Sequence, residues 1–216
     1  MELDNIIYPG FNKTLSELNA ISKIKKKSCE IVDLTEIEWV RDVLRHRVEE
    51  VGTYDIKFRK PTDEEIKSVS EIVGADINID ELKNNFHKNK RIIGITSGKG
   101  GVGKSTITSL LGIAFDELGK KVGIMDSDIW GYSVPKILGA KFPPIPFNER
   151  IFPSRINNLN VISMDYFVKQ DEAVIWRGPM LHKAIEQFLF EVLWHDIDVL
   201  LIDLSLIHIS EPTRRT

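Results

Sequence analysis

Cysteine is almost absent from this 216-residue sequence, in which Cys29 is the single example. One copy of the chain therefore cannot form an internal disulfide or a metal cage made of cysteines. Long apolar runs are absent too, because runs such as Val199–Ile202 fall far short of the roughly 18 residues that suggest a membrane helix. The start, MELDNIIYPG, lacks the basic residues and apolar core of a signal peptide. We therefore expect a cytoplasmic protein with no membrane partner.

Neither sign of charge dominates the chain. Its 29 lysines and arginines face 32 acidic residues, for a net charge of -3. Such a balance provides no overall attraction to nucleic acid, so we expect no nucleic-acid partner. The hydrophobic fraction of 42% and the charged fraction of 28% are close to those of soluble globular proteins, which argues against a disordered or fibrous chain. The length suits one α/β domain and a smaller second domain.

The chain divides by composition into four parts. Residues 1–60 mix short strand-like runs with one helical pattern near Glu36–Val51, which predicts a small α+β domain. Residues 61–89 are polar and read as a linker. Residues 90–204 alternate strands with helices, and residues 205–216 lose this pattern abruptly.

The alternation in residues 90–204 predicts the fold class. Short apolar strands separated by helices indicate an α/β fold, a parallel sheet with helices on both faces. A proline-rich segment from Lys141 to Pro153 is predicted to be an irregular surface loop. The expected strands cover 92–95, 122–125, 159–164 and 199–202, and the expected helices cover 104–118 and 180–194.

A glycine-rich segment between the first expected strand and the first expected helix matches the phosphate-loop pattern G-x-x-x-x-G-K-S/T. Glycines let successive backbone N–H groups turn toward phosphates, and the helix N-terminus adds a positive dipole end. A chance match is disfavoured by the order strand, loop, helix. We expect Lys104 to reach the outer phosphates and Ser105 to coordinate Mg²⁺. The predicted nucleotide-binding residues are Gly98, Lys99, Gly100, Gly101, Val102, Gly103, Lys104, Ser105 and Thr106.

Acidic residues end two of the other expected strands. Asp126 and Asp128 follow strand 122–125, and Asp203 follows strand 199–202. Ligands of open parallel sheets bind at the carboxyl ends of the strands. We expect Asp128 to orient the attacking water and Asp126 and Asp203 to support Mg²⁺, although Asp126 and Asp128 are interchangeable at this stage. The alternatives are a helix cap or turn for the first two and a solvated strand end for Asp203.

The segment SGKGGVGKST closely resembles the deviant phosphate loop of a group of dimeric ATPases. This group includes the nitrogenase iron protein, MinD, ParA and Mrp. The resemblance implies ATP as the nucleotide and a homodimer. It also implies that Lys99 reaches the partner's nucleotide as a positive charge, as an arginine finger does elsewhere. The catalytic residues implied are then Lys99, Lys104 and Asp128.

Three stretches, 126–135, 174–180 and 198–203, resemble the Mrp (ApbC-like) branch of iron–sulfur cluster carriers. Residues 1–60 resemble more faintly the iron–sulfur-assembly domain that precedes the ATPase in many members. The resemblance covers about residues 90–204. It implies an ATP-hydrolysing carrier that transfers clusters to apo-proteins and works with scaffold proteins, with Trp176 and Arg177 near the subunit interface or a switch region.

Two features of that family have no counterpart here. The family's C-terminal Cys-x-x-Cys pair, which bridges a 4Fe–4S cluster across the dimer, is absent, so this chain lacks the cluster ligands. The later strands of the ATPase domain are also missing, which predicts an exposed sheet edge and aggregation. Residues 205–216 resemble a translated sequencing adapter, and we expect them to be a non-native tail.

Two other functions remain open from the sequence. A positioning ATPase of the MinD or ParA type would need a membrane-targeting or DNA-binding segment, and residues 205–216 have neither a convincing apolar face nor more than two basic residues. The second alternative is a nucleotide-gated binding module that does not hydrolyse its nucleotide.

Overall fold

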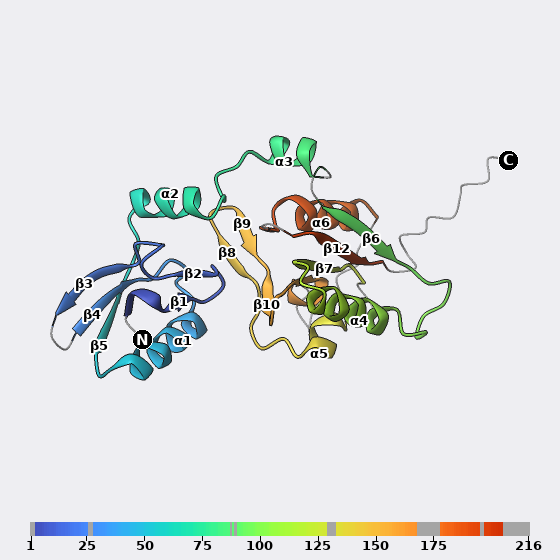
Figure 1. The fold of residues 1–216 in the computed structure, drawn as a ribbon. Helices are drawn as coiled ribbons and strands as arrows, with labels where there is room; N and C mark the ends of the chain where they lie inside the picture. Colours follow the sequence, from blue (N-terminus) through green and yellow to red (C-terminus); the bar gives the residue numbers. More distant parts are fainter. Residues whose placement is uncertain are drawn as a thin grey trace. The chain divides into compact units, whose positions relative to one another are not determined.

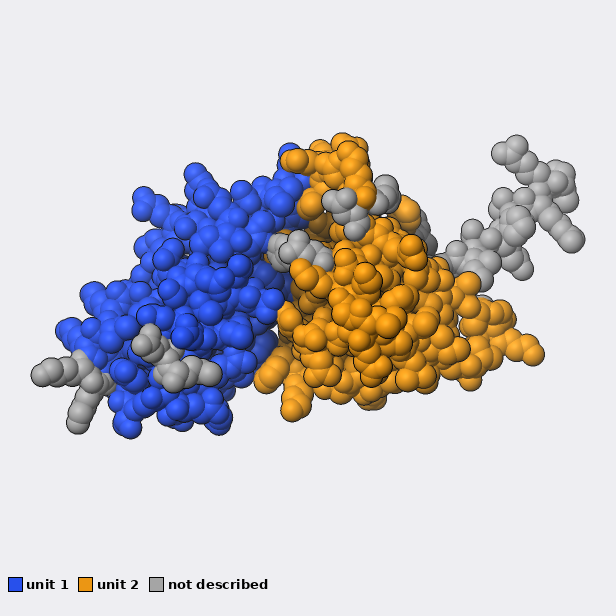
Figure 2. Space-filling view, viewed as in Figure 1, with its two compact units in different colours: residues 1–78, 145–152 blue, residues 79–144, 153–216 orange. Residues whose placement is uncertain are grey.

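The structure is a computed structural model that describes residues 3–25, 28–86, 88, 90–128, 133–167, 178–194 and 197–204. It consists of two compact units (Figures 1 and 2). Unit 1 comprises residues 1–78 and 145–152, and unit 2 comprises residues 79–144 and 153–216. The boundaries of these units differ from the predicted boundaries at 60/61 and 89/90. The reason is that the segment expected to be a linker contains two helices.

Unit 1 is built on a three-stranded sheet of order β3-β4-β5, in which β3 and β4 are antiparallel and β4 and β5 are parallel. The parallel pair is connected by helix α1, which buries the apolar stripe Val40, Leu44 and Val48. The elements are η1 (Leu3–Asn5), β1 (Ile7–Tyr8), β2 (Lys13–Thr14), β3 (Ile21–Lys25), β4 (Ser28–Val32), α1 (Glu38–Val51), β5 (Asp55–Arg59), α2 (Asp63–Ile72), β8 (Ile145–Phe147) and β9 (Arg150–Phe152).

The β8–β9 hairpin corrects the prediction of an irregular loop over residues 141–153. Its two strands are antiparallel, and Asn148 and Glu149 take the positive φ angles of 45° and 62° that a tight hairpin turn requires. The hairpin packs in unit 1, where the ring of Phe11 lies 5.1 Å from that of Phe147 and 4.3 Å from that of Phe152. These long-range aromatic contacts stabilise a hairpin that its own proline-rich sequence does not predict.

Buried Arg150 fixes the hairpin to the end of the α2 region. Its guanidinium donates to the carbonyl oxygens of Ala75, at 3.2 Å, and of Ile77. Helix α2 itself begins with a capping box, in which Thr62 Oγ1 accepts from the Glu65 N–H and the Glu65 carboxylate accepts from the Thr62 N–H. Residues 61–78, which were expected to be part of a linker, therefore belong to unit 1.

Unit 2 contains a five-stranded sheet of order β10-β11-β7-β12-β6. Strands β11, β7, β12 and β6 are parallel, and β10 pairs antiparallel to β11 at one edge. The predicted α/β class is confirmed, and β10 is an addition to it. The elements are α3 (Ile79–Asn85), β6 (Arg91–Ile95), α4 (Lys104–Glu117), β7 (Val122–Asp126), α5 (Val134–Leu138), β10 (Ser154–Ile156), β11 (Leu159–Ser163), η2 (Met164–Tyr166), α6 (Gly178–Phe190) and β12 (Val199–Asp203).

Helices cover both faces of this sheet (Figure 1). On the α4 face, a Cβ placed at Gly112 would lie 2.6 Å from Ile124 Cδ1, so glycine permits the close approach of α4 to β7. On the opposite face, a Cβ at Gly123 would lie 2.8 Å from the Trp194 ring. Both faces of β7 are therefore packed without spare space, and all five of its residues are buried. None of the described helices is long and apolar enough to cross a membrane.

The other side of α4 is apolar and exposed. Leu110 is 59% exposed and Leu118 is 74% exposed, and β6 has β12 as its one neighbour among the described strands. Exposed apolar surface next to an unpaired strand edge favours association between copies.

Substitution of Gly123 by alanine tests the packing of β7 against the Trp194 ring. We expect Gly123→Ala to lower the free energy of unfolding by about 1–3 kcal/mol, because the methyl group overlaps the ring and the core must shift. Urea denaturation followed by tryptophan fluorescence measures this change. The matched control is Gly94→Ala in β6, where a Cβ meets only the movable Leu204 side chain at 3.1 Å. Equal losses for the two variants would contradict the packing argument.

Glu65 provides a pH-dependent test of unit 1. Hydrogen bonds from Arg59 and from the Thr62 backbone lower the pKa of the Glu65 carboxyl from 4.5 to about 2. A lowered pKa in the folded state stabilises the fold above pH 4.5, and this contribution is lost as the pH falls from about 4.5 to about 2. We expect Glu65→Gln to cost about 1 kcal/mol at pH 7 and progressively less below pH 4.5 in urea unfolding series. Exposed Glu64→Gln is the control, and a loss for Glu65→Gln that does not vary with pH would contradict the assignment.

Candidate functional site

The loop between β6 and α4 is shaped to receive an anion. Gly101 and Gly103 have φ angles of 71° and 91°, which side chains rarely adopt. A Cβ added at Gly98, Gly100, Gly101 or Gly103 would meet no atom within 4 Å, so the space beside these glycines is open. Gly103 is the N-cap of α4 and provides no side-chain cap. The first N–H groups of α4 therefore remain available to a bound anion.

Lys104, the first residue of α4, lies among the predicted carboxylates. Its ammonium nitrogen is 2.5 Å from Asp203 Oδ1 and 3.5 Å from Asp128 Oδ2. The side chain of Lys104 is 10% exposed, and those of Asp203 and Asp128 are 0% and 19% exposed. Parallel pairing explains the convergence, because Asp203 and Asp126 are register partners at the carboxyl ends of β12 and β7. The ammonium group balances charge that the interior would otherwise leave uncompensated.

Asp126 is fully buried and accepts hydrogen bonds from the segment that follows β7. Its Oδ2 accepts from the N–H groups of Ser133 and Val134 and from the Ser163 hydroxyl, at 3.1–3.2 Å, and its Oδ1 accepts from the Asp128 N–H at 3.2 Å. Burial, together with the nearby charge of Asp203, raises the pKa of the Asp126 carboxyl to about 6. Asp126 therefore positions the start of α5 and the backbone of Asp128.

Two serines that the sequence interpretation missed hold the strand ends together. Ser127 donates both its N–H, at 3.1 Å, and its hydroxyl, at 2.6 Å, to the carbonyl oxygen of Asp203. Ser163 ends β11, the neighbour of β7 on its other side, and bonds Asp126. The signal in the sequence was a polar residue at the end of a buried strand, adjacent to the predicted site.

The remaining predicted site residues lie in the loop and in the first turn of α4. Ser105 is half-buried in that turn, and its carbonyl oxygen accepts a hydrogen bond from the Ser109 hydroxyl. Lys99, Val102 and Thr106 are exposed. The structure thus brings Lys104, Asp126, Asp128 and Asp203 together and leaves the Lys99 side chain in solvent. Trp176 and Arg177 lie outside the described residues, as do residues 205–216.

The arrangement suits a phosphate group accompanied by a divalent cation. Asp203 Oδ2 is buried and has no hydrogen-bond partner, which leaves one acceptor for a cation or its water shell. Mg²⁺ is held in proteins by one or two carboxylates together with substrate phosphates and waters, so it needs no dedicated cage. In agreement, no group of three His, Cys, Asp or Glu side chains within the described ranges forms a preformed metal site.

The ion pair of Lys104 yields a stability prediction. Lys104→Met removes the compensating charge and leaves Asp203 buried, so we expect it to lower the free energy of unfolding of unit 2 by about 3 kcal/mol at pH 7. In the double variant Lys104→Met/Asp203→Asn most of this loss is restored. A double-mutant cycle by urea denaturation measures the coupling. Additive losses would show that the pair does not act as a unit.

The model of the family described as ParA: NUBPL iron-transfer P-loop NTPase matches residues 88–205, more than half of the chain. The iron-sulfur cluster carrier protein of Mycobacterium leprae is 46% identical over 114 residues, which is 53% of this chain and 30% of that protein.

Two relatives align over nearly the whole chain. The iron-sulfur cluster carrier protein of Helicobacter pylori is 32% identical over 94% of this chain and 55% of its own length, and that of Aquifex aeolicus is 33% identical over 90% and 58%. The chain thus spans between about a third and somewhat over half of the relatives it matches. Among solved structures, a nucleotide-binding protein of Archaeoglobus fulgidus in complex with ADP is 32% identical, with a TM-score of 0.47, and the match covers 60% of this chain and 50% of that one.

Proposed function

The chain belongs to the ParA family of NUBPL iron-transfer P-loop NTPases, and on that premise we propose that it binds and hydrolyses ATP with Mg²⁺ as the nucleotide-dependent part of an iron–sulfur cluster carrier. The observation that carries the proposal is the convergence of Lys104, Asp128 and Asp203 beside an open glycine loop. The relatives named iron-sulfur cluster carrier protein support the cluster as the cargo.

Residues 98–106 would bind the triphosphate. The space beside the loop glycines is open, and the N-terminus of α4 has no side-chain cap. The backbone N–H groups there would bind the phosphates. Lys104 would move its ammonium group from Asp203 to the outer phosphates, and this exchange replaces one anionic partner by another at the same end of the sheet. The carboxylate of Asp203 would then be free to hold the cation.

Ser105 and Asp203 would hold Mg²⁺, and Asp126 would support them by fixing the segment after β7. When bound, Mg²⁺ neutralises charge on the phosphate oxygens. Asp128 would orient a water for attack, and its partial exposure and its position beside Lys104 support this role. The exposed position of Lys99 suits a residue that acts on the nucleotide of a second copy.

The transferred cluster is cargo, and its ligands do not come from the described residues of one copy. Cys29 is buried in unit 1, and burial raises the pKa of its thiol, which disfavours the thiolate that a metal needs. We propose that the complete carrier is a cytoplasmic homodimer that transfers clusters to apo-proteins and works with scaffold proteins. The family membership and the names of the relatives support this assignment.

Asp128→Asn tests the hydrolytic assignment. We expect this variant to bind ATP nearly as the unaltered chain does but to hydrolyse it at least about 100-fold more slowly, because a neutral amide orients and polarises water poorly. Phosphate release measures the rate, and equilibrium dialysis with labelled ATP measures binding. Glu117→Gln, on the exposed end of α4, is the matched control. If Asp128→Asn released phosphate as fast as the control, Asp128 would have no role in catalysis. If the unaltered chain bound ATP without hydrolysing it, the result would favour a nucleotide-gated module.

A further inference from the structure

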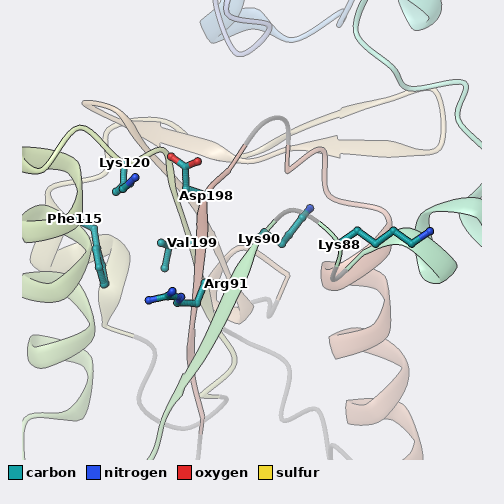
Figure 3. A pocket seen from close by; sticks show the side chains of 7 residues that line it. All are labelled: Lys88, Lys90, Arg91, Phe115, Lys120, Asp198 and Val199. Atoms are coloured by element: carbon teal, nitrogen blue, oxygen red, sulfur yellow. The ribbon is translucent and has the colours of Figure 1, made fainter.

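A second cavity lies at the opposite end of the unit 2 sheet from the glycine loop (Figure 3). It has a volume of about 660 Å³ and lies where β6 and β12 begin and where α4 has ended. Helix α4 has 14 residues and therefore extends about 21 Å away from the loop. The cavity is thus separate from the nucleotide site. Four basic residues line it, namely Lys88, Lys90, Arg91 and Lys120.

Backbone hydrogen bonds make the base of this cavity rigid. The Arg91 N–H donates to the Asp198 carbonyl at 2.8 Å, and the Asp198 N–H donates to the Lys121 carbonyl at 2.8 Å. The Lys121 N–H in turn donates to Asp198 Oδ2 at 2.9 Å. The one carboxylate in the lining is therefore already engaged by the backbone. The surrounding cations extend from a fixed frame of three chain segments.

The lining of the cavity carries four cationic side chains and one carboxylate, that of Asp198. None of the four cations forms an ion pair with a carboxylate of the described residues. Lys90 lies 4.4 Å from the centre of the Phe86 ring, and burial lowers the pKa of its ammonium group. Figure 3 shows Arg91 and Lys120 on the same side of the strands as Val199, Lys90 on the other side, and Lys88 extending further away. Like charges held together in this way are stabilised by an anion.

We propose that this cavity binds a small organic molecule that carries several phosphate groups. Arg91 provides a planar fork that matches phosphate oxygens, and Lys90 and Lys120 add point charges on either side. Half-buried Phe115 and buried Val199 form an apolar wall for the organic part. A volume of this size is within the usual range of small-molecule sites. The site does not depend on the proposed ATPase function.

Isothermal titration calorimetry with tripolyphosphate as the probe tests this site. Tripolyphosphate can also enter the glycine loop, so the variants Arg91→Gln and Lys104→Ala are titrated in parallel. We expect a binding event that survives Lys104→Ala and is weakened at least about tenfold by Arg91→Gln. Lys141→Gln, an exposed lysine of unit 2 outside the cavity, is the matched control and should leave this event unchanged.

Three other results would overturn the proposal. Binding that Lys104→Ala abolishes and Arg91→Gln leaves intact belongs to the glycine loop and overturns the proposal, as does equal weakening by Arg91→Gln and Lys141→Gln. Citrate that binds as tightly as tripolyphosphate would overturn the assignment to phosphate. The Arg91 side chain is exposed, so thermal unfolding should be unaltered in Arg91→Gln. If that variant does unfold, Lys120→Gln, which is also exposed, replaces it with the same expected loss.

Discussion

Three carboxylates end neighbouring parallel strands of unit 2, or follow directly after them, and one ammonium group lies among them. Taking Lys104 and Asp203 out of water costs several kcal/mol, and their attraction offsets that cost only because they meet at 2.5 Å. The pair also fixes the first turn of α4 against the end of β12, and thereby fixes the glycine loop that precedes α4. The position of Lys104 among the carboxylates depends on this one interaction, whereas strand pairing and the hydrogen bonds of Asp126 and Ser127 hold the strand ends themselves. In the function proposed above, a phosphate would take the place of Asp203 beside Lys104, and a cation would take the place of Lys104 beside Asp203.

The convergence of Lys104, Asp128 and Asp203 could be predicted from the sequence, since it follows local rules. A glycine loop between a strand and a helix, and aspartates at strand ends, are read from adjacent residues, and parallel pairing then brings Asp126 and Asp203 to one edge. The serines were missed because their roles are set by contacts across strands. Ser127 bonds the backbone of a residue 76 positions away. The roles of all the predicted site residues stay predictions, since they concern a nucleotide, a cation and, for Lys99, a second copy of the chain.

The division into units could not be predicted for a related reason. Prolines in residues 141–153 indicate a loop, yet Pro146 lies in the short strand β8, where an exposed position tolerates the missing N–H group. The hairpin is stabilised by Phe11 and by the carbonyls that Arg150 contacts, all far away in the sequence. The chain therefore leaves unit 2 after α5, contributes β8 and β9 to unit 1, and returns. A cut at residue 60 would separate the hairpin and α2 from the rest of their core.

Equilibrium binding of ATP to the unaltered chain and to Lys104→Ala, in the presence of Mg²⁺, tests the central claim most directly. The account predicts one saturable site per chain and an affinity at least about 100-fold lower in Lys104→Ala, because the alanine removes a charged partner of the phosphates and leaves the carboxylates to repel them. Equal affinity in the two chains would contradict it, and the cluster around Asp203 would then be a structural ion pair and not a nucleotide site.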